Sequence, residues 1–226
     1  MKTPRIVVMA GSSRREAYSR RVAAACAQAL KAAGGEVDLI ELADYPAPLY
    51  NGDLEVEAGL PDGIVRLQQI LHACDGLLVV NPEYNGSITP LLKNTLDWCS
   101  RPNPADRARS GGAVYAGRAA AVVGSSPGAL GGMRVLFHVR DILGYLGMHV
   151  IPQQLAVGKA GEAVGDDGRL NDPAQQEMLD NLAAALVDSP AHARLAWFTD
   201  GVLRYDQIGE HLVVTDIRLG MTGVHP

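Results

Sequence analysis

Short apolar runs alternate with longer segments of helical period through the first 188 residues of this sequence. Such alternation predicts βαβ units, and therefore a parallel sheet that is covered by helices on both faces. The first run is almost continuously apolar, as expected of a central strand that is buried on both faces. The expected strands are Arg5–Ala10, Glu36–Leu42, Gly76–Asn81, Arg118–Gly124 and His149–Ile151. The pattern thus predicts a doubly wound α/β domain.

The segments between these runs place apolar residues three and four positions apart, which predicts helices. The first of them begins near Tyr18 and ends at Gly34. Two long stretches break the pattern. Asp44–Asp62 holds three prolines and two glycines and is predicted to be a loop, and Arg101–Gly117 is a second polar excursion.

Residues 190–226 depart from the α/β pattern of residues 1–189. Leu195–Tyr205 and His211–Leu219 are rich in Val, Leu, Thr and aromatic residues, and Gln207–Glu210 lies between them with a glycine. This arrangement predicts a C-terminal β-hairpin extension whose role the sequence does not reveal. An exposed apolar hairpin is prone to association, so we expect it to pack on its own domain or on a partner.

The charge and the cysteines exclude several classes of protein. A net charge of −5 with a pI near 5.6 offers no basic face for nucleic acid. The apolar run near the N-terminus, Arg5–Ala10, stops at Gly11 and is too short for the core of a signal peptide or for a membrane span. The three cysteines are far apart in apolar stretches, which predicts buried thiols in a cytoplasmic protein rather than disulfides. The six histidines have no metal-ligand spacing, so we expect packing or surface roles for them and no metal site.

Polar loops follow three of the expected strands directly, and open α/β sheets bind ligands at the carboxyl ends of their strands. The first loop, Gly11–Ser19, combines hydroxyls, an arginine and the amides of a helix N-terminus, which suits a phosphate group. It has neither GxGxxG nor GxxxxGK spacing. A serine-rich helix N-cap accounts for the same residues equally well.

The second loop, Asn81–Ser87, and the third, Gly124–Gly132, fit the two sides of a flat heteroaromatic ligand. The second offers an aromatic ring, amides and hydroxyls, which can border such a ring. The third has four glycines among nine residues, so its backbone can approach a ligand closely. A tight turn with an N-cap at Ser87, and a flexible connector, are the respective alternatives.

Taken together, these loops resemble those of the NADPH-dependent FMN reductase family, which includes chromate, quinone and azo-dye reductases. The motifs are GSSR after the first strand, PEYNGS and LKNTLDW after the third, and SSPGALGG after the fourth. The resemblance implies a flavodoxin-like fold with strand order 2-1-3-4-5. It also implies a homodimer or homotetramer that uses FMN and NADPH to reduce a small acceptor such as a quinone, an azo compound, chromate or free flavin.

Because flavin carries the hydride in such enzymes, the resemblance implies no catalytic acid, base or nucleophile. The residues that it assigns to FMN fall on the three loops. Those matched to the phosphate are Ser12, Arg14 and Ser19. Those matched to one side of the isoalloxazine are Pro82, Glu83, Tyr84, Asn85 and Ser87, and those matched to its other side are Ser126, Pro127, Gly128 and Gly131.

The first loop departs from the family pattern. The family often has Ser where this chain has Ala17, and Asn where it has Ser19. One phosphate hydroxyl is then missing, so we expect some apoprotein after purification. Arg20 and Arg21 extend the basic cluster that Arg14 and Arg15 begin. The arginines not used on FMN are candidates for the 2′-phosphate of NADPH, and a solvated helix face is the alternative.

The helix after PEYNGS raises a question about assembly. In the resembling family this region helps to build a homodimer near the flavin, which makes Trp98 either an interface or a helix-core residue. Lys93 and Asp97 are four residues apart, as in an intrahelical or an intersubunit pair. A flavodoxin-like electron carrier or flavin sensor is the alternative function, although such carriers usually have a more acidic surface.

Overall fold

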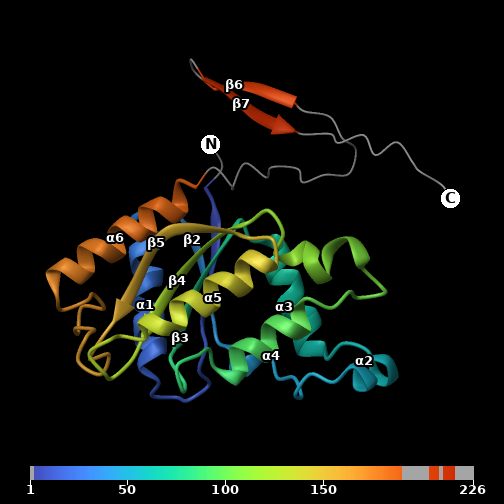
Figure 1. Cartoon of the computed structure of the whole chain (residues 1–226), viewed down its shortest axis with the longest axis horizontal. Helices are drawn as coiled ribbons and strands as arrows, with labels where there is room; N and C mark the ends of the chain where they lie inside the picture. The colour runs from blue at the N-terminus through green and yellow to red at the C-terminus, as the bar shows by residue number, and fades with distance from the viewer. Residues whose placement is uncertain (1–2, 190–203, 209–210, 217–226) are drawn as a thin grey trace.

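The computed structural model describes residues 3–189, 204–208 and 211–216 of the chain (Figure 1). Residues 3–189 contain a five-stranded parallel sheet in the order β2-β1-β3-β4-β5, which confirms the expected topology. The strands are β1 (Arg5–Ala10), β2 (Glu36–Ile40), β3 (Gly76–Pro82), β4 (Ala119–Ser125) and β5 (His149–Val157).

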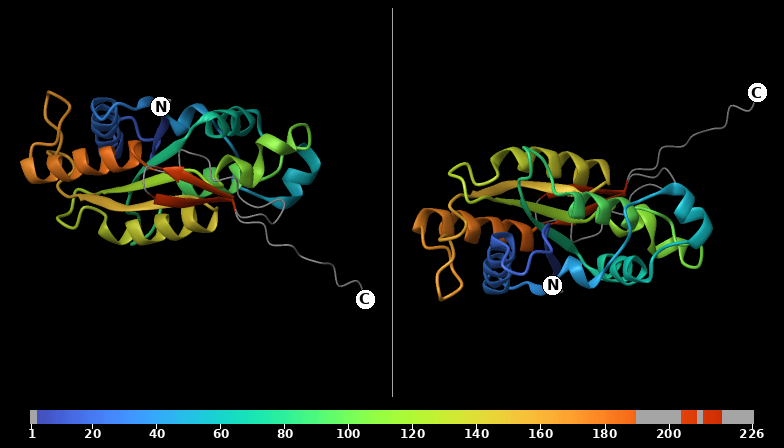
Figure 2. Two further views of the ribbon diagram at one scale, coloured as in Figure 1. Left: turned by 90° about the horizontal axis from the view of Figure 1, so that it is seen from above. Right: turned by 90° about the horizontal axis from the view of Figure 1, so that it is seen from below.

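Helices cover both faces of this sheet. The α-helices are α1 (Tyr18–Ala32), α2 (Gly52–Ala58), α3 (Asp62–Ala73), α4 (Pro90–Cys99), α5 (Met133–Tyr145) and α6 (Pro173–Val187), and the short 3-10 helices are η1 (Leu42–Asp44), η2 (Arg107–Arg109) and η3 (Gly111–Val114). Figure 2 shows α1 in blue and α5 in yellow on opposite sides of the strands. The chain therefore forms a three-layer sandwich.

The alternation of side chains along β1 explains the two cores. Ile6 and Val8 belong to the core beneath α1 and α6, whereas Val7 and Met9 belong to the core beneath α3, α4 and α5. All four of these side chains are fully buried. Because both faces of the strand are covered, its sequence is an uninterrupted apolar run, and each buried side chain stabilises the fold by about 1.5–3 kcal/mol.

The expected loop Asp44–Asp62 is partly wrong, because α2 lies within it. The helix begins after Asn51, whose side chain accepts a hydrogen bond from the Asp53 amide at 2.8 Å. None of its residues is buried, so it has no apolar stripe by which the sequence could reveal it. The second strand also ends earlier than expected, at Ile40, because η1 begins at Leu42.

The last strand of the sheet is longer than expected. β5 continues to Val157, whereas the apolar run ends at Ile151. The continuation begins with Pro152 and two glutamines, and the register against β4 shifts at this point, between Ala120 and Val122. Because the second half of β5 contains a bulge and polar residues, a prediction based on continuous apolar runs does not detect it.

The C-terminal hairpin forms an antiparallel pair, β6 (Arg204–Ile208) with β7 (His211–Asp216). β6 runs through Gln207, which the sequence assigned to the turn. Most of the expected strand Leu195–Tyr205 lies outside the described residues, as do the side chains of the hairpin. The packing of the hairpin and the boundary between residues 1–189 and 190–226 stay predictions.

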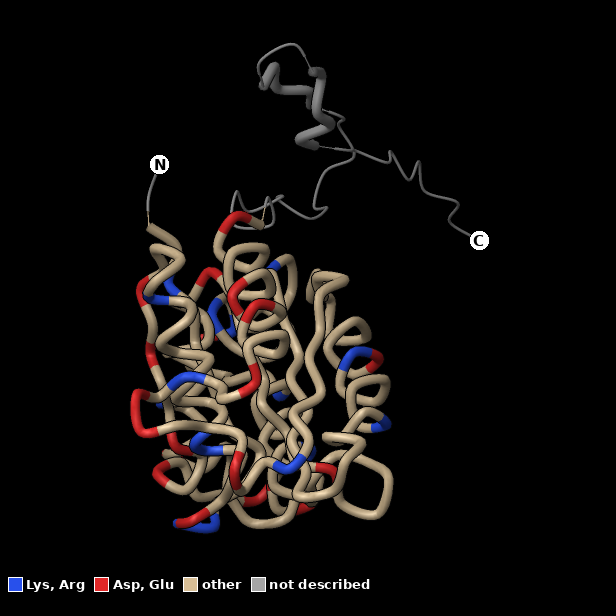
Figure 3. Tube along the Cα trace, turned by 90° about the vertical axis from the view of Figure 1, so that its left-hand side faces the viewer, with Lys and Arg blue, Asp and Glu red and all other residues tan. Residues whose placement is uncertain are grey.

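Charged positions of both signs are intermixed on the side of the domain shown in Figure 3. Within the described part of the chain, no helix is both long enough and apolar enough to cross a membrane. The same residues contain no group of three His, Cys, Asp or Glu side chains arranged to hold a metal ion.

Candidate functional site

A cavity of about 300 Å³ lies at the carboxyl edge of the sheet, where β1, β3 and β4 end side by side. Its position beside β1 and β3 is the topological switch point, because β2 lies on one side of β1 and the later strands lie on the other. The lining residues come from all three polar loops and are Ser12, Arg14, Ala17, Tyr18, Ser19, Pro82, Glu83, Tyr84, Ser125, Ser126 and Pro127.

Eight of the twelve residues that the resemblance assigns to FMN line this cavity, and four are not among its lining residues. The four are Asn85, Ser87, Gly128 and Gly131. Tyr18 and Ser125 line the cavity as well, although the sequence did not single them out. Ser125 could have been found from its position, since it ends a buried strand immediately before the expected contact Ser126.

The first loop places one arginine at the cavity. Arg14 forms no ion pair with any described carboxylate, and its guanidinium lies 5.3 Å from the centre of the Tyr18 ring. The ring in turn lies against Gly161. α1 begins at Tyr18 after Ala17, whose carbonyl accepts the Arg20 amide at 3.0 Å but whose side chain caps none of the first amides of the helix. Positive charge and helix amides meet here, as an anion requires.

The second loop is a two-residue turn. The amides of Tyr84 and Ser87 each donate to the other residue's carbonyl at 3.0 Å. Asn85 has φ 50° and Gly86 has φ 80°, which are the left-handed angles of a type I′ turn. The tight turn expected in this loop is therefore present, but the expectation that Ser87 caps the next helix is wrong. Thr89 caps α4, and its Oγ1 accepts the Leu92 amide at 3.2 Å.

Residues beneath the first two loops hold them together. Thr89 Oγ1 donates to the Gly11 carbonyl at 2.6 Å and also contacts Asn81 Oδ1 at 3.1 Å. Both Thr89 and Asn81 are buried. A side chain at Gly11 would collide with Asn81, so glycine is required where the first loop leaves β1.

Two side chains of α5 contact the second loop from outside. The Arg134 guanidinium bonds to the Glu83 carboxylate, with Nε at 2.6 Å from Oε1. One turn further along the helix, His138 Nδ1 lies 2.8 Å from Ser87 Oγ. Nothing in the sequence marks Arg134, and the spacing of His138 predicts only a packing or surface residue. The fold brings both to the loop, since they are 51 positions away from their partners.

The third loop is fixed rather than a flexible connector. The Ser126 amide donates to the Val157 carbonyl at 3.1 Å, and the Ala160 amide donates to the Ser126 carbonyl at 3.0 Å. Gly131 has φ 62° and lies directly against the backbone of Ala156 and Gly158 at the end of β5, where any side chain would collide. Glycine at this position lets the loop close on its own domain, and this keeps Ser126 at the cavity.

Three buried polar atoms that belong to lining residues have no partner within the described part of the chain. They are Ser19 Oγ, Ser125 Oγ and Glu83 Oε2. A buried polar atom without a hydrogen bond costs about 1–3 kcal/mol. The residues that line the cavity thus carry two unpartnered hydroxyls, one unpartnered carboxylate oxygen and the Arg14 cation, a set of groups that suits a polar, anionic ligand.

Two further arginines of the basic cluster, Arg20 and Arg21, are engaged elsewhere. Arg20 Nε donates to Glu41 at 3.0 Å, and Arg21 Nη2 donates to the Val164 carbonyl at 2.7 Å. Neither is a freely solvated residue of a helix face. Their contacts join α1 to the segments after β2 and β5, so these arginines are less available to a nucleotide than the sequence suggested.

The polar groups of three side chains on α4, the helix after the second loop, have hydrogen-bond or ion-pair partners within the chain. Trp98 is fully buried, and its indole N–H donates to the Pro48 carbonyl at 2.8 Å. The Tyr50 ring meets it edge-on at 5.1 Å. Lys93 and Asp97 pair within α4 at 2.7 Å. Trp98 thus has the helix-core role, and the Lys93–Asp97 pair is intrahelical.

The geometry defines the chain as a flavodoxin-like α/β protein with a polar cavity at its switch point. The family model for NADPH-dependent FMN reductases matches residues 4–162, and the chain belongs to that family. It is 36% identical over 183 residues to a quinone reductase of Pseudomonas putida, covering 79% of this chain and 92% of that protein. It is 33% identical over 192 residues to a probable NADPH:quinone oxidoreductase 2 of Oryza sativa, covering 82% and 88%.

A solved structure agrees with these sequence relatives. The flavoenzyme NAD(P)H:(acceptor) oxidoreductase FerB of Paracoccus denitrificans superposes with a TM-score of 0.69 at 26% identity. The alignment covers 82% of this chain and 96% of that chain. The resemblance drawn from the loop motifs is confirmed, and the chain is an NAD(P)H-dependent oxidoreductase rather than the alternative electron carrier.

Proposed function

We propose that this protein binds FMN in the cavity at the carboxyl edge of the sheet and uses NADPH to reduce a small acceptor of the quinone class. The observation that carries the proposal is the set of unpartnered buried atoms of Ser19, Ser125 and Glu83 in that cavity. Such atoms destabilise an empty fold, and a ligand with complementary groups offsets the cost.

The phosphate of FMN belongs at the first loop. Arg14 supplies a cation that no described carboxylate neutralises, and Ser12 and Ser19 supply hydroxyls. The N-terminus of α1 adds its partial positive charge at the same place. Charge-assisted hydrogen bonds of this kind are about twice as strong as neutral ones, so this end of the cavity orients the whole nucleotide.

The flat ring belongs between the second and third loops. Pro82 and Tyr84 line one side of the cavity, and Ser126 and Pro127 line the other. The type I′ turn and the close packing of Gly131 restrict the backbone on both sides, and the Gly128 amide is held by Ser126 Oγ at 3.2 Å. When bound, FMN accepts a hydride from a nicotinamide and passes the electrons to the acceptor. The loops hold it and stabilise the negative charge that develops on it.

A quinone is the acceptor class that the relatives and the cavity favour. The P. putida relative is named a quinone reductase, and a Burkholderia relative that is 31% identical is named a 2-hydroxy-1,4-benzoquinone reductase. In this chain the Tyr84 side chain lines the cavity yet stays about half exposed, at 48%. It offers an aromatic surface at the mouth of the cavity to a planar, weakly polar substrate.

We also propose that the protein is a homodimer or homotetramer in the cytoplasm. Met133 and Phe137 are exposed one turn apart on α5. Each directly precedes a residue that contacts the second loop, Arg134 or His138. Exposed large apolar side chains of this kind commonly mark an interface. Three buried free thiols agree with a reducing compartment.

The decisive experiment is a titration of the apoprotein with FMN, followed by flavin fluorescence. We expect Ser19→Ala and Ser125→Ala each to raise the Kd about tenfold, because each removes one hydrogen bond to the ligand. Ser110→Ala is the matched control. Ser110 is equally buried, but its Oγ already accepts the Asn103 amide at 2.8 Å, so its loss destabilises the fold without changing the Kd.

The unfolding of the apoprotein gives a second readout. Removal of an unpartnered hydroxyl does not destabilise the empty protein, so Ser125→Ala keeps the wild-type Tm or raises it. Wild-type protein that fails to bind FMN, or serine variants that bind it as wild type does, would overturn the proposal. An anaerobic spectrum before and after addition of NADPH and then a benzoquinone tests the electron path, and bleaching without reoxidation by the quinone counts against the acceptor.

A further inference from the structure

The ion pair between Glu83 and Arg134 is strongly asymmetric. The Glu83 side chain is 7% exposed, whereas the Arg134 side chain is 65% exposed. Two nitrogens of the guanidinium, Nε and Nη2, converge on the same carboxylate oxygen, Oε1. A bidentate pair would instead use both oxygens. The guanidinium thus balances the charge of the carboxylate through Oε1 alone, and Oε2 makes no hydrogen bond with Arg134.

The second oxygen is the unusual part of this pair. Glu83 Oε2 is buried and has no hydrogen-bond partner among the described residues, although Glu83 lines the cavity. An ionised carboxylate accepts about four hydrogen bonds, and a buried oxygen without any is costly. Because Arg134 engages only Oε1, Oε2 is left as an unpartnered acceptor on a residue that lines the cavity.

The contacts of α5 limit the freedom of this carboxylate. Arg134 and His138 lie four residues apart on one face of the helix, and their partners Glu83 and Ser87 are also four residues apart. The helix therefore contacts the loop through two side chains, one on each side of the turn at Asn85 and Gly86. The ion pair with Arg134 and the fixed loop together restrict how the Glu83 carboxylate can turn.

We propose that Arg134 is a positioning residue, which holds Glu83 so that Oε2 accepts a hydrogen bond from an N–H or O–H donor of the bound flavin mononucleotide. The proposal rests on the proposed function, since it assumes FMN in this cavity. FMN carries such donors at ring N3 and on its ribityl chain. Arg134 also cancels the charge of Glu83, so that the carboxylate does not repel the anionic phosphate.

A double-mutant cycle on FMN binding tests this role. We expect Glu83→Leu to raise the Kd of the apoprotein for oxidised FMN about tenfold or more, because a hydrogen bond to a charged acceptor is lost. Arg134→Gln raises the Kd by a similar factor in the wild-type background. In the Glu83→Leu background, Arg134→Gln changes the Kd for FMN by less than about twofold, since Arg134 acts through Glu83. Arg134→Lys restores most of the affinity because it keeps the charge.

Two FMN analogues identify the donor. If ring N3–H is the donor, 3-methyl-FMN binds the wild type about tenfold more weakly than FMN does, and Glu83→Leu abolishes that difference. If a ribityl hydroxyl is the donor, a deoxyribityl analogue behaves in this way instead. Both results support the proposal, whereas equal discrimination by wild type and Glu83→Leu against both analogues contradicts it.

Arg169→Gln is the matched control, because Arg169 forms an exposed pair with Asp180 outside the residues that line the cavity. It should leave the Kd unchanged. Glu83→Leu leaves Arg134 in solvent, so it creates no buried unpaired charge, and Glu83→Ala serves as a second variant. Wild-type affinity in Glu83→Leu, with FMN bound normally by the wild type, overturns this inference alone. Failure of the wild type to bind FMN overturns the proposed function as well.

Discussion

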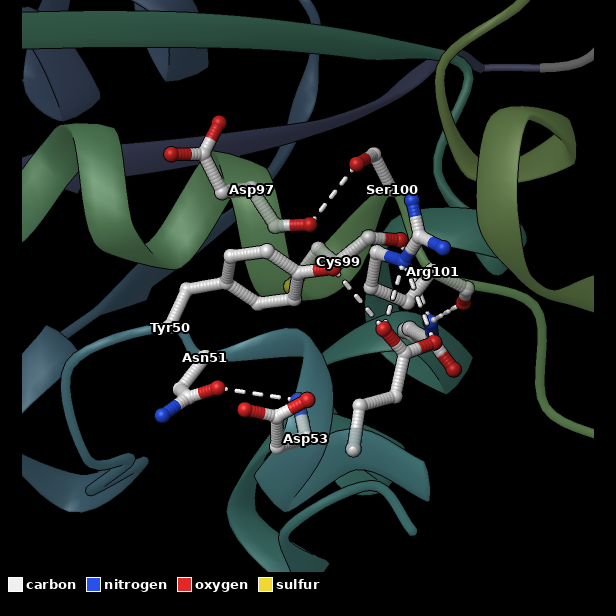
Figure 4. Close-up of polar contacts among 9 residues, drawn as sticks. Tyr50, Asn51, Asp53, Asp97, Cys99, Ser100 and Arg101 are labelled. Atoms are coloured by element: carbon white, nitrogen blue, oxygen red, sulfur yellow. Dashed lines mark hydrogen bonds and ion pairs between the residues drawn. The ribbon is translucent and has the colours of Figure 1, made fainter.

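Arg101 Nε donates to both oxygens of the Glu55 carboxylate, at 3.1 Å and 2.9 Å, and so joins two segments that are 46 residues apart (Figure 4). Tyr50 adds a third contact, since its hydroxyl donates to Glu55 Oε2 at 2.9 Å. That hydrogen bond raises the pKa of Tyr50 above its ordinary value. The three side chains tie the long segment before α3 to the end of α4, and they explain how α2 stays in place although none of its residues is buried.

The first prediction concerns this three-residue contact. Arg101→Met should destabilise the protein by about 0.5–1 kcal/mol, a modest value because the Arg101 side chain is 41% exposed. It should also speed limited proteolysis between residues 45 and 61, because that segment loses its tie to α4. Arg109→Met, which breaks the more exposed pair with Asp106, is the control and should alter neither measurement. Equal cleavage of both variants would show that the contact does not hold the segment.

The sheet was predictable from the sequence because its strands are buried on both faces. β1 and β3 are uninterrupted apolar runs, and a short run of this kind between helical segments is typical of a central strand in a parallel sheet. α2 and the second half of β5 were not predictable. An exposed helix has no apolar stripe, and Pro152 with two glutamines breaks the apolar run at a bulge.

The site was predictable only in part, for a related reason. Residues on loops that directly follow strands, such as Ser12 and Glu83, are placed at the cavity by the topology alone. Arg134 and His138 reach the second loop from a helix that is distant in sequence. The packing angle of α5 decides which of its residues meet the loop, and no local pattern encodes that angle.

The second prediction compares two glycines that both have open space around them. Gly86 has φ 80° in the type I′ turn, whereas Gly144 lies in the helical backbone of α5. Gly86→Ala should destabilise the protein by about 1–2 kcal/mol, because a side chain disfavours left-handed backbone. Gly144→Ala should stabilise it by about 0.5–1 kcal/mol. Urea unfolding measures both, and a sign change in either value contradicts the backbone argument.

The third prediction concerns the missing phosphate hydroxyl. Ala17 is the N-cap residue of α1, with φ −69° and ψ 130°, and it caps nothing with its side chain. Ala17→Ser should stabilise the protein by about 1 kcal/mol through helix capping. It should also slow FMN loss, so that the fraction of apoprotein after purification falls. Ala33→Ser, at the other end of the same helix, is the control. An unchanged flavin content in Ala17→Ser would show that residue 17 does not face the phosphate.

The fourth prediction concerns the choice between NADPH and NADH. Arg21 is held by the carbonyls of Gly161 and Val164, so Arg15 is the better candidate for the 2′-phosphate. Arg15→Gln should lower kcat/KM for NADPH about tenfold and leave that for NADH unchanged, because only NADPH carries the phosphate. Arg21→Gln should lower the Tm without changing the ratio of the two values. Equal kcat/KM for both nucleotides in the wild type would rule out a phosphate contact here.

The fifth prediction concerns the buried thiols. Burial raises the pKa of Cys26 to about 12 and that of Cys74 to about 11. In the unfolded chain these thiols have an ordinary pKa of about 8.5. A folded pKa above the unfolded value stabilises the protein fully below about pH 8.5, and the stability is lost as the pH rises toward the folded pKa.

Urea unfolding between about pH 9 and pH 10.5 measures that loss. Each thiol should contribute about 1.4 kcal/mol per pH unit to the decline, because only the unfolded chain ionises in this window. Cys26→Ala lowers the absolute stability through the cavity it leaves, but it should make the decline shallower by one thiol. The folded protein should also resist alkylation at about pH 8, since the thiolate is the nucleophile. An unchanged slope in Cys26→Ala would mean that this thiol ionises equally in both states, which its complete burial argues against.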